Sequence, residues 1–310
     1  MSLDLSTLKH RVSDQAAPQV YYTQDISPSA LRIVYEALGR KPAGRVAVKL
    51  STGEAGNPNY LQPALIKDLV QSFAGTIVEG NTAYHGARHE TQAHRQLIHE
   101  HGFDAIAKVD ILDEEGSIDL PVVGGTHLKF DRVGSHLTNY DFLVVLSHFK
   151  GHPRGGFGGA LKNISIGIAA PEGKNLIHTA GTTNTSQWGP YLSRDFDSPE
   201  HLAFIESMAE AAQAVCHYFG PKVLYISVLN HLSVDCDCVS HPAPATMADL
   251  GIAASLDPVA LDQACVDLIY AAPDGADVIE RMESRHGSRI LEHAAHLGVG
   301  SRHYQLTILD

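Results

Sequence analysis

The sequence has 310 residues, of which 44% are hydrophobic and 19% charged, which is typical of one large or two modest globular domains. With 35 acidic and 23 basic residues the formal net charge is -12, which disfavours nucleic acid phosphates and anionic membrane surfaces as partners. No stretch approaches the roughly 20 consecutive apolar residues of a membrane helix, and the polar start lacks the apolar core of a secretory signal. We therefore expect a cytoplasmic protein with no nucleic acid or membrane partner and with reduced cysteines.

Apolar residues change repeatedly between the spacing of strands and that of helices along the chain. Short apolar runs predict strands at residues 45–50, 76–80, 105–112, 140–148, 222–229 and 304–309. Amphipathic spacing predicts helices at residues 63–73, 90–101 and 199–219, and a further helix that Asp257 caps and Pro258 opens. Strands that alternate with helices indicate a Rossmann-like α/β fold, with a mostly parallel sheet and helices on both faces.

The chain can be divided into two lobes near residue 195. Residues 1–195 would form an N-terminal α/β lobe and residues 196–310 a C-terminal α/β lobe, with the site between them; one compact domain is the alternative. Residues 151–194 and 233–248 show no periodicity and follow predicted strands. Because ligands of open α/β sheets bind beyond the carboxyl ends of the strands, we expect these two segments and residues 81–89 to converge on one site.

Histidine is unusually abundant, with 19 residues. It is the most common metal ligand and it titrates near neutral pH, so its abundance favours metal or proton-transfer chemistry. Part of this excess is expected to be solvated, because five histidines lie on the predicted outer surfaces of helices. These are His94, His99, His101, His293 and His296.

A glycine-rich loop with histidines and lysines extends from His148 to Asn163. Four glycines surround Phe157 there, and they could turn backbone N–H groups toward a phosphate or carboxylate. The spacing fits neither a P-loop nor a dinucleotide fingerprint. A flexible loop beside a structural lysine is the alternative interpretation. The predicted cofactor-binding residues are Lys150, Gly155, Gly156, Gly158, Gly159, Lys162 and Asn163.

Most of the chain resembles the uncharacterised "Fe-S center" family, domain-of-unknown-function family 362. The resemblance rests on the segments HFKGH, GGFGGALKNISIG, SVDCDC and DPVALDQAC. A smaller part is similar to the nickel-pincer lactate racemase superfamily, in which a histidine, a glycine-rich loop with an aromatic residue, a lysine and a second histidine appear in that order. His152, the loop around Phe157, Lys162 ten residues after His152, and His178 sixteen residues further on follow that order.

The racemase resemblance implies a cofactor and a reaction. Lys162 would hold a nickel pyridinium dithio-acid mononucleotide through a thioamide, His178 would be the axial nickel ligand, and His152 would be an acid/base group. The nickel–carbon centre would accept a hydride from a small hydroxy acid-like anion while histidines move the hydroxyl proton, which makes the protein an isomerase, a racemase or an oxidoreductase. The residue types suit these roles, because neutral imidazole binds nickel and a lysine beside other cations becomes a nucleophile. His148 is a further candidate metal ligand.

Two segments depart from the racemase pattern. The racemases have a substrate-binding arginine after the first strand and a second acid/base histidine after the second, whereas the comparable segments here contain Lys49 and His85. His85 and His89, like His148 and His152, lie four residues apart just beyond a strand. We expect the two pairs to lie close together and to suppress each other's protonation, which keeps a base available near pH 7.

The second irregular loop places two thiols, Cys236 and Cys238, among aspartates and shortly before His241. These three residues could form a mononuclear metal site, or the thiols a redox-active pair; a tight polar turn is the alternative. Cys216 and Cys265 lie on apolar helix faces, so we expect them in the core and expect no complete iron–sulfur cluster. An iron–sulfur or mononuclear-metal redox protein and a non-catalytic phosphate- or nucleotide-binding module are the alternative functions. The oligomeric state is open.

Overall fold

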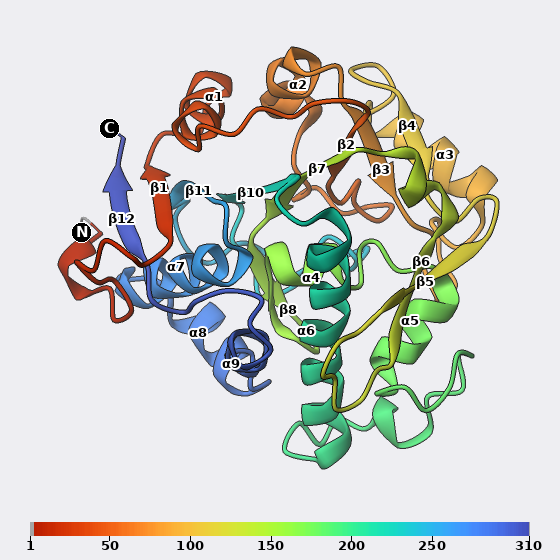
Figure 1. Cartoon of the computed structure of the whole chain (residues 1–310). Helices are drawn as coiled ribbons and strands as arrows, with labels where there is room; N and C mark the ends of the chain where they lie inside the picture. The colour runs from red at the N-terminus through yellow and green to blue at the C-terminus, as the bar shows by residue number, and fades with distance from the viewer. Residues whose placement is uncertain (1–2, 310) are drawn as a thin grey trace.

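The computed structural model describes residues 3–309, and its centre is one eight-stranded sheet (Figure 1). The strands run in the order β12-β1-β11-β10-β7-β2-β3-β4. Five of the seven neighbouring pairs are parallel, and β11 is antiparallel to both of its neighbours, so the predicted mostly parallel sheet is confirmed. The strands are β1 (Gln19–Thr23), β2 (Val46–Lys49), β3 (Thr76–Glu79), β4 (Val109–Ile111), β7 (Phe142–His148), β10 (Val223–Leu229), β11 (Gly251–Ser255) and β12 (Gln305–Ile308).

Helices cover both faces of this sheet, as predicted (Figure 1). Successive strand residues point to opposite faces, so Val48 packs in the core beneath α1, α2 and α3 while Ala47 packs in the core beneath α4, α6 and α7. The helices are α1 (Pro28–Ala37), α2 (Pro63–Ser72), α3 (Thr91–Glu100), α4 (Ala160–Ile164), α5 (Pro171–His178), α6 (Pro199–Phe219), α7 (Pro258–Ala271), α8 (Ala276–Glu283) and α9 (Arg289–His296). Short 3-10 helices are η1 (Leu5–Thr7), η2 (Ser135–Asn139) and η3 (Gly189–Leu192).

Two short hairpins lie outside the main sheet. β5 (Ser117–Pro121) pairs with β6 (Phe130–Gly134), and β8 (Lys150–His152) pairs with β9 (Gly156–Gly158). Since β8 begins two residues after the end of β7, the second hairpin keeps the glycine-rich loop close to the carboxyl end of that strand.

Local capping signals explain why several predicted helices are confirmed. The Ser198 side chain accepts a hydrogen bond from the backbone N–H of His201 at the start of α6, which has the predicted bounds. Asp257 likewise accepts from the backbone N–H groups of Val259 and Ala260 at the start of α7. Each side chain satisfies N–H groups that have no partner within the helix. The predicted strand at residues 105–112 is confirmed only over the three residues of β4.

The prediction that residues 151–194 are irregular is wrong in part, because β9, α4 and α5 lie within this segment. α4 has five residues and α5 has eight, which is too short for a clear amphipathic period. The backbone N–H groups that begin α4 donate to Asp262, a residue of α7. A capping partner that distant in sequence leaves no local signal.

The prediction for His94 is also wrong, because its side chain is buried on the inner face of α3. Its Nδ1 atom lies 3.1 Å from Oδ1 of Asn81, and burial lowers its pKa to about 3. Of the other four histidines on predicted outer helix surfaces, two are exposed and two are half-buried. The exposed ones are His99 and His296, and the half-buried ones are His101 and His293.

The predicted lobe boundary at residue 195 lies between η3 and α6. β7 and β10, from the two sides of this boundary, pair in parallel within the main sheet. Both segments therefore contribute strands to the same sheet, and the division into lobes stays a prediction. None of the helices within residues 3–309 is long and apolar enough to cross a membrane.

Candidate functional site

A cavity lies beyond the carboxyl ends of β2, β3, β7 and β10. It encloses about 130 Å³, whereas one water molecule needs roughly 10–15 Å³ of such space, so the cavity has room for a small organic molecule. Arg88 lines it from the segment after β3, Lys162 and His178 from the segment after β7, and Cys238 from the loop after β10. The three segments that the sequence singles out therefore meet at one place.

The lining of this cavity is cationic although the chain as a whole is acidic. Five lining side chains are lysine or arginine and two are carboxylates, in a chain whose formal net charge is -12. A concentration of positive charge in a confined site attracts small anions. These side chains are Lys49, Arg88, Lys150, Lys162 and Lys174, with Glu79 and Asp237.

Glu79, at the end of β3, neutralises part of this charge. Its carboxylate accepts a hydrogen bond from Nζ of Lys49 at 2.9 Å and from the backbone N–H of Thr52 at 2.8 Å, and Nη1 of Arg88 lies 3.7 Å away. Burial alone would raise the pKa of Glu79, but the charges of Lys49 and Arg88 outweigh burial and lower the pKa to about 2. Lys49, which lies in the segment where the racemase pattern has its substrate-binding arginine, is thus paired with a carboxylate of the protein.

Arg88 brings a guanidinium to the same edge of the cavity, although sequence reasoning gave it no role. Its Nε donates to Glu54 at 3.2 Å and its Nη2 to the hydroxyl of Tyr84 at 3.1 Å. The racemase pattern places its arginine after the first strand of the site, whereas Arg88 lies beyond β3. The signal that identifies Arg88 is its place in the segment 81–89, where it is the only lysine or arginine.

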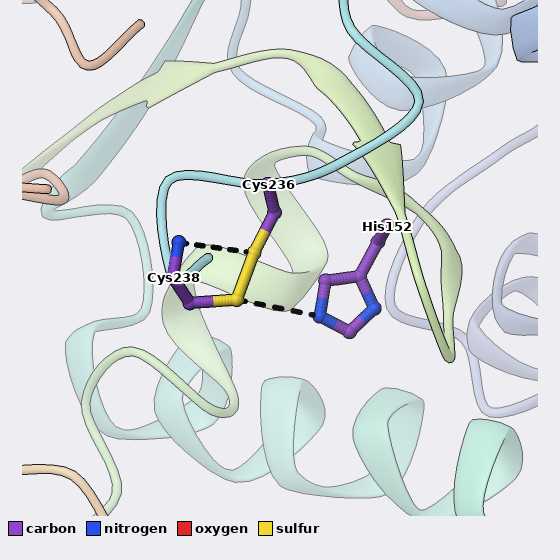
Figure 2. A group of neighbouring side chains, drawn as sticks. All are labelled: His152, Cys236 and Cys238. Atoms are coloured by element: carbon purple, nitrogen blue, oxygen red, sulfur yellow. Dashed lines mark hydrogen bonds between the residues drawn. A yellow bond between two sulfur atoms is a disulfide. The ribbon is translucent and has the colours of Figure 1, made fainter. Parts of the chain in front are cut away.

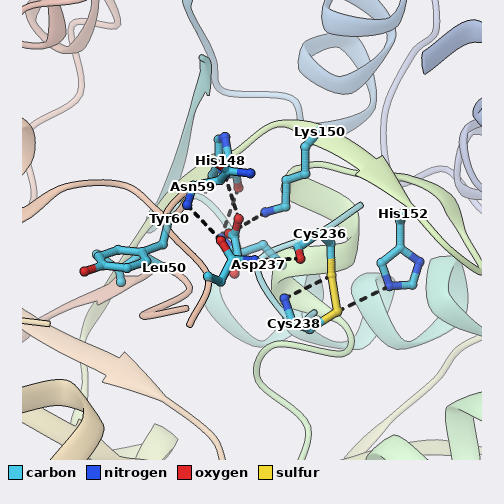
Figure 3. A network of polar contacts seen from close by, with 12 residues as sticks. Leu50, Asn59, Tyr60, His148, Lys150, His152, Cys236, Asp237 and Cys238 are labelled. Carbon is cyan, nitrogen blue, oxygen red and sulfur yellow. Dashed lines mark hydrogen bonds and ion pairs between the residues drawn. A yellow bond between two sulfur atoms is a disulfide. The ribbon is translucent and has the colours of Figure 1, made fainter. Parts of the chain in front are cut away.

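His148 and Lys150 share the carboxylate of Asp237 (Figure 3). Nδ1 of His148 and Nζ of Lys150 each lie 2.7 Å from an oxygen of Asp237. Burial would raise the pKa of Asp237, but the charges of Lys150 and His148 hold it well below its usual range. Nε2 of His148 donates to the carbonyl oxygen of Asn230 at 2.6 Å. Both ring nitrogens of His148 are therefore hydrogen-bond donors in this arrangement, which leaves no lone pair for a metal, and a ligand role for His148 would require these hydrogen bonds to change.

Lys162 lies on α4 and contributes its side chain to the cavity. Its Nζ has no hydrogen-bond or ion-pair partner among residues 3–309. Burial, followed by repulsion from Lys150, lowers the pKa of Lys162 to about 7. At neutral pH a large fraction of this amine is therefore unprotonated, which is the reactive form of a lysine nucleophile.

The carboxylate of Asp262 binds backbone N–H groups at the end of the glycine-rich loop. It accepts hydrogen bonds from the backbone N–H groups of Ala160 at 2.7 Å and Leu161 at 2.9 Å. A Cβ atom at Gly159 would lie 2.4 Å from an oxygen of Asp262, so this close approach requires glycine. At the start of α4 these N–H groups therefore bind a carboxylate of the protein, and the anion-binding role of the other loop residues stays a prediction.

The predicted cofactor-binding residues divide into two groups in space. Lys150, Gly158, Gly159, Lys162 and Asn163 line the cavity. Gly155 and Gly156 lie outside the lining: the N–H of Gly155 donates to His152, and Gly156 has a φ of 78° and packs against Gly287. Gly155 and Gly156 therefore belong to the segment that holds His152 in place, and they do not face the cavity.

His178 is held rigidly at the end of α5. Its Nδ1 donates to the carbonyl oxygen of Lys174 at 2.7 Å, so its Nε2 carries the lone pair. The ring stacks on Trp188 at a centroid distance of 4.4 Å and on Phe204 at 4.8 Å. Burial lowers the pKa of His178 to about 3. A neutral imidazole that is oriented through a backbone carbonyl is typical of a metal-binding histidine.

His152 has the opposite tautomer. Its Nδ1 accepts a hydrogen bond from the backbone N–H of Gly155 at 2.7 Å, and the N–H of Arg154 lies 3.3 Å away. Nε2 therefore carries the proton, and it lies 4.0 Å from Sγ of Cys238. Burial, then the charge of Lys162, lowers the pKa of His152 well below its usual range. His152 is thus a neutral donor at the cavity wall.

Cys236 and Cys238 form a disulfide (Figure 2), so the expectation of reduced cysteines is wrong for this pair. Their sulfur atoms and a ring nitrogen of His152 lie within 4.8 Å of one another. Metal ions bind thiolates, and a disulfide sulfur has no such negative charge. Cys265 is buried and Cys216 half-buried, both outside the cavity lining, and neither can complete a four-cysteine cluster there.

Two predicted site residues lie apart from the cavity. His85 and His241 are exposed and do not belong to its lining. The rings of His85 and His89 contact each other at 4.7 Å, but this pair does not join His148 and His152 at the lining. Sequence reasoning gave no role to Lys174, Trp188 or Asp262, whose positions depend on contacts between distant segments.

Comparison with solved structures finds distant similarities, among them the following two proteins. The lactate racemase apoprotein from Thermoanaerobacterium thermosaccharolyticum is 14% identical with a TM-score of 0.43, and the match covers 70% of this chain and 52% of that one. A crystal structure of a protein from Thermotoga maritima is 13% identical with a TM-score of 0.45, covering 81% of this chain and 58% of that one. The chain thus spans little more than half of the length of either protein.

Comparison with curated proteins finds no match. The family model described as domain of unknown function (DUF362) matches residues 46–267. This range contains every residue that lines the cavity. It also covers well over half of the chain, and the protein therefore belongs to the DUF362 family.

Proposed function

We propose that the cavity binds a nickel pyridinium dithio-acid mononucleotide at Lys162 and His178, and that the protein is an isomerase or oxidoreductase for a small hydroxy acid-like anion. One observation carries this proposal. The amine of Lys162, which has a pKa of about 7 and no partner among residues 3–309, lines the same cavity as His178, whose Nε2 lone pair is free for a metal. The order and spacing of His152, Lys162 and His178 in the sequence support the same assignment.

The donor groups of the cavity fit this cofactor. An unprotonated Lys162 can form an amide-type bond to a thio-acid, and His178 offers a neutral nitrogen of the kind that suits nickel. The cationic lining suits the phosphate of the mononucleotide. When bound, the cofactor supplies a metal–carbon centre that takes up and returns the hydrogen of a carbinol carbon.

Lys174 is the lining cation that we assign to the substrate anion. Its Nζ donates to the carbonyl oxygen of Ala169 and has no carboxylate partner within bonding distance among the described residues. Burial lowers the pKa of Lys174 to about 8, while the charges of Asp113 and Glu79 oppose this shift. At neutral pH Lys174 is therefore charged enough to bind an anion, and its pKa is close enough to 7 for exchange of a hydroxyl proton.

His152 acts in this proposal as an oriented donor. Its Nδ1 already accepts a hydrogen bond from the backbone N–H of Gly155, so this atom cannot accept a proton from the substrate. The Nε2–H group can donate to an oxygen of the substrate and stabilise the negative charge that develops on it. His152 would therefore act as a hydrogen-bond donor and not as a general acid or base, and the unprotonated fraction of Lys174 would exchange the hydroxyl proton.

Trp188 provides the test, because it is the only tryptophan of the chain and stacks on His178. We expect nicotinic acid mononucleotide, a pyridinium carboxylate with a phosphate, to change the Trp188 fluorescence in a saturable way. Nicotinic acid riboside, which keeps the carboxylate and lacks only the phosphate, should have much less effect at the same concentration. The signal should weaken with added salt, because the cationic lining provides the attraction.

A matched pair of variants controls this titration. Lys174→Met lowers the positive charge of the whole lining, which attracts the phosphate of the mononucleotide as well as the substrate anion, and we expect it to weaken binding of the mononucleotide by about tenfold. Lys222→Met removes an exposed lysine just before β10, at the other end of that strand, and should leave binding unchanged. Equal responses to the mononucleotide and to the riboside, or equal effects of the two substitutions, would contradict the assignment of the cavity.

A further inference from the structure

The Cys236–Cys238 disulfide lies in the wall of the cavity, beside His152 (Figure 2). We propose that it is a reversible two-electron redox couple that a small anionic thiol reduces from inside the cavity. This proposal needs neither nickel nor the mononucleotide, so it is independent of the function proposed above.

Each sulfur atom of the disulfide has an N–H donor beside it. The backbone N–H of Cys238 donates to Sγ of Cys236 at 3.2 Å. The Nε2–H of His152 lies 4.0 Å from Sγ of Cys238, and its direction follows from the hydrogen bond that Nδ1 accepts from Gly155. Donors of this kind stabilise a thiolate more than a neutral sulfur, so they favour both thiolates that reduction produces.

The accessibility of the two sulfur-bearing residues differs, and this difference fixes the point of attack. Cys236 is only 2% exposed, whereas Cys238 is half-buried. An incoming thiolate therefore attacks Sγ of Cys238. The S–S bond breaks, its electron pair goes to Sγ of Cys236, and this atom leaves as a thiolate beside the N–H group that donates to it.

A second thiol completes the exchange. Its thiolate attacks the sulfur of the small molecule in the mixed disulfide, and the electron pair of that bond goes to Sγ of Cys238. The small thiol leaves as a symmetrical disulfide, having lost two electrons, and the cysteine pair has gained two electrons and, in its neutral form, two protons. Without a second thiol, Cys236 attacks Cys238 and restores the disulfide.

The charge of the cavity selects the reductant. Lys150 and Lys162 line the cavity together with Cys238, and Lys162 has no carboxylate partner among the described residues. A thiol that carries a carboxylate is attracted to this lining, and a thiol of similar size that carries an ammonium group is repelled.

A metal site formed by His152, Cys236 and Cys238 is the competing interpretation of the same cluster. Coordination through Nε2 would require the proton of His152 to move to Nδ1, where it would face the N–H of Gly155 at 2.7 Å. The observed tautomer therefore favours thiol chemistry over metal binding.

The experiment follows the thiol count of the full-length protein purified without reductant. After denaturation in excess maleimide, the intact mass should show two labelled cysteines, Cys216 and Cys265, before reduction and four afterwards. At equal thiolate concentrations and at about pH 6, where most of Lys162 is protonated, 3-mercaptopropionate should open the disulfide about tenfold faster than cysteamine at low salt. The ratio should approach one in about 1 M salt, where charges are screened within about 3 Å.

Two variants test the source of this selectivity. Lys162→Met should reduce the preference for the anionic thiol several-fold, whereas Lys222→Met should preserve it. If Lys162→Met does not fold, the salt dependence of the wild-type ratio decides the question. Four labelled cysteines in air-exposed protein, equal rates for the two thiols at low salt, or zinc retained on the cysteines would overturn the proposal.

Discussion

Nδ1 of His178 donates to the carbonyl oxygen of Lys174, one turn earlier in α5, at a distance of 2.7 Å. This bond fixes the tautomer of His178 and places two groups of different chemistry on the same helix face, a neutral nitrogen and an amine. Because α5 begins at Pro171 and ends at His178, a short helix supplies both of them to the cavity.

The stacked position of His178 predicts a measurable loss of stability when its ring is removed. His178→Ala gives up two ring contacts, with Trp188 and with Phe204, and such contacts contribute about 0.5–1.5 kcal/mol each. We expect the free energy of unfolding in urea to fall by about 2 kcal/mol. His99→Ala, at an exposed position of α3, should stay within about 0.5 kcal/mol of the parent. Equal losses for the two variants would contradict the stacked arrangement.

Lys162 should react with amine reagents at a lower pH than an ordinary lysine. Its pKa of about 7, caused first by burial and then by repulsion from Lys150, predicts that labelling by trinitrobenzenesulfonate reaches half of its maximal rate near pH 7. Peptide mass spectrometry measures this rate separately for each lysine. A labelling midpoint for Lys162 close to pH 10, the usual lysine pKa, would show that the pKa of this amine is not lowered.

Asp262 acts as a positioning residue for Lys162. Its carboxylate accepts from two N–H groups at the start of α4, so Asp262→Ala should both destabilise the fold by about 1–3 kcal/mol and change the rate at which Lys162 is labelled. Asp257→Ala is the control, because it removes two comparable hydrogen bonds at the start of α7, together with a third from the backbone N–H of Ser301. The control should lower stability and leave the labelling of Lys162 as it was. If both variants alter the labelling equally, Asp262 is only structural.

Glu79 should make the stability of the protein depend on pH in the acid range. Its pKa is lowered from 4.5 to about 2 by Lys49 and Arg88, against the effect of burial. A carboxyl with a lowered pKa in the folded state stabilises the fold above pH 4.5, and this contribution is lost as the pH falls toward 2. The shift corresponds to about 3 kcal/mol. The difference in unfolding free energy between the parent and Glu79→Gln should therefore shrink between pH 6 and pH 3, and a constant difference would contradict the ion pair.

The sequence predicts those parts of the structure that depend on local signals. The bounds of α6 follow from Ser198, Pro199 and a long apolar period, and the meeting of three loops follows from strand order. The parts that it misses depend on distant partners. Asp262 and Ala160 are 102 residues apart, and His148 and Asp237 are 89 residues apart. No local sequence pattern predicts such contacts. They cap the start of α4 and make both ring nitrogens of His148 hydrogen-bond donors.

In the site, too, some features follow from local sequence and others depend on contacts between distant residues. The spacing of His152, Lys162 and His178 predicts that they belong to one site, and all three line the same cavity. Their protonation depends on surroundings that the sequence does not describe. His152 and His178 have opposite tautomers because one accepts from a backbone N–H and the other donates to a backbone carbonyl.

The proposed function is tested most directly by the mass of the peptide that contains Lys162, together with the nickel content, in protein produced in a host that makes the nickel-pincer cofactor. The account predicts a covalent adduct on Lys162 and about one nickel per chain, with nickel lost and the fold kept in His178→Gln. If protein from such a host, grown with sufficient nickel, has an unmodified Lys162 and contains no nickel, the central claim is contradicted.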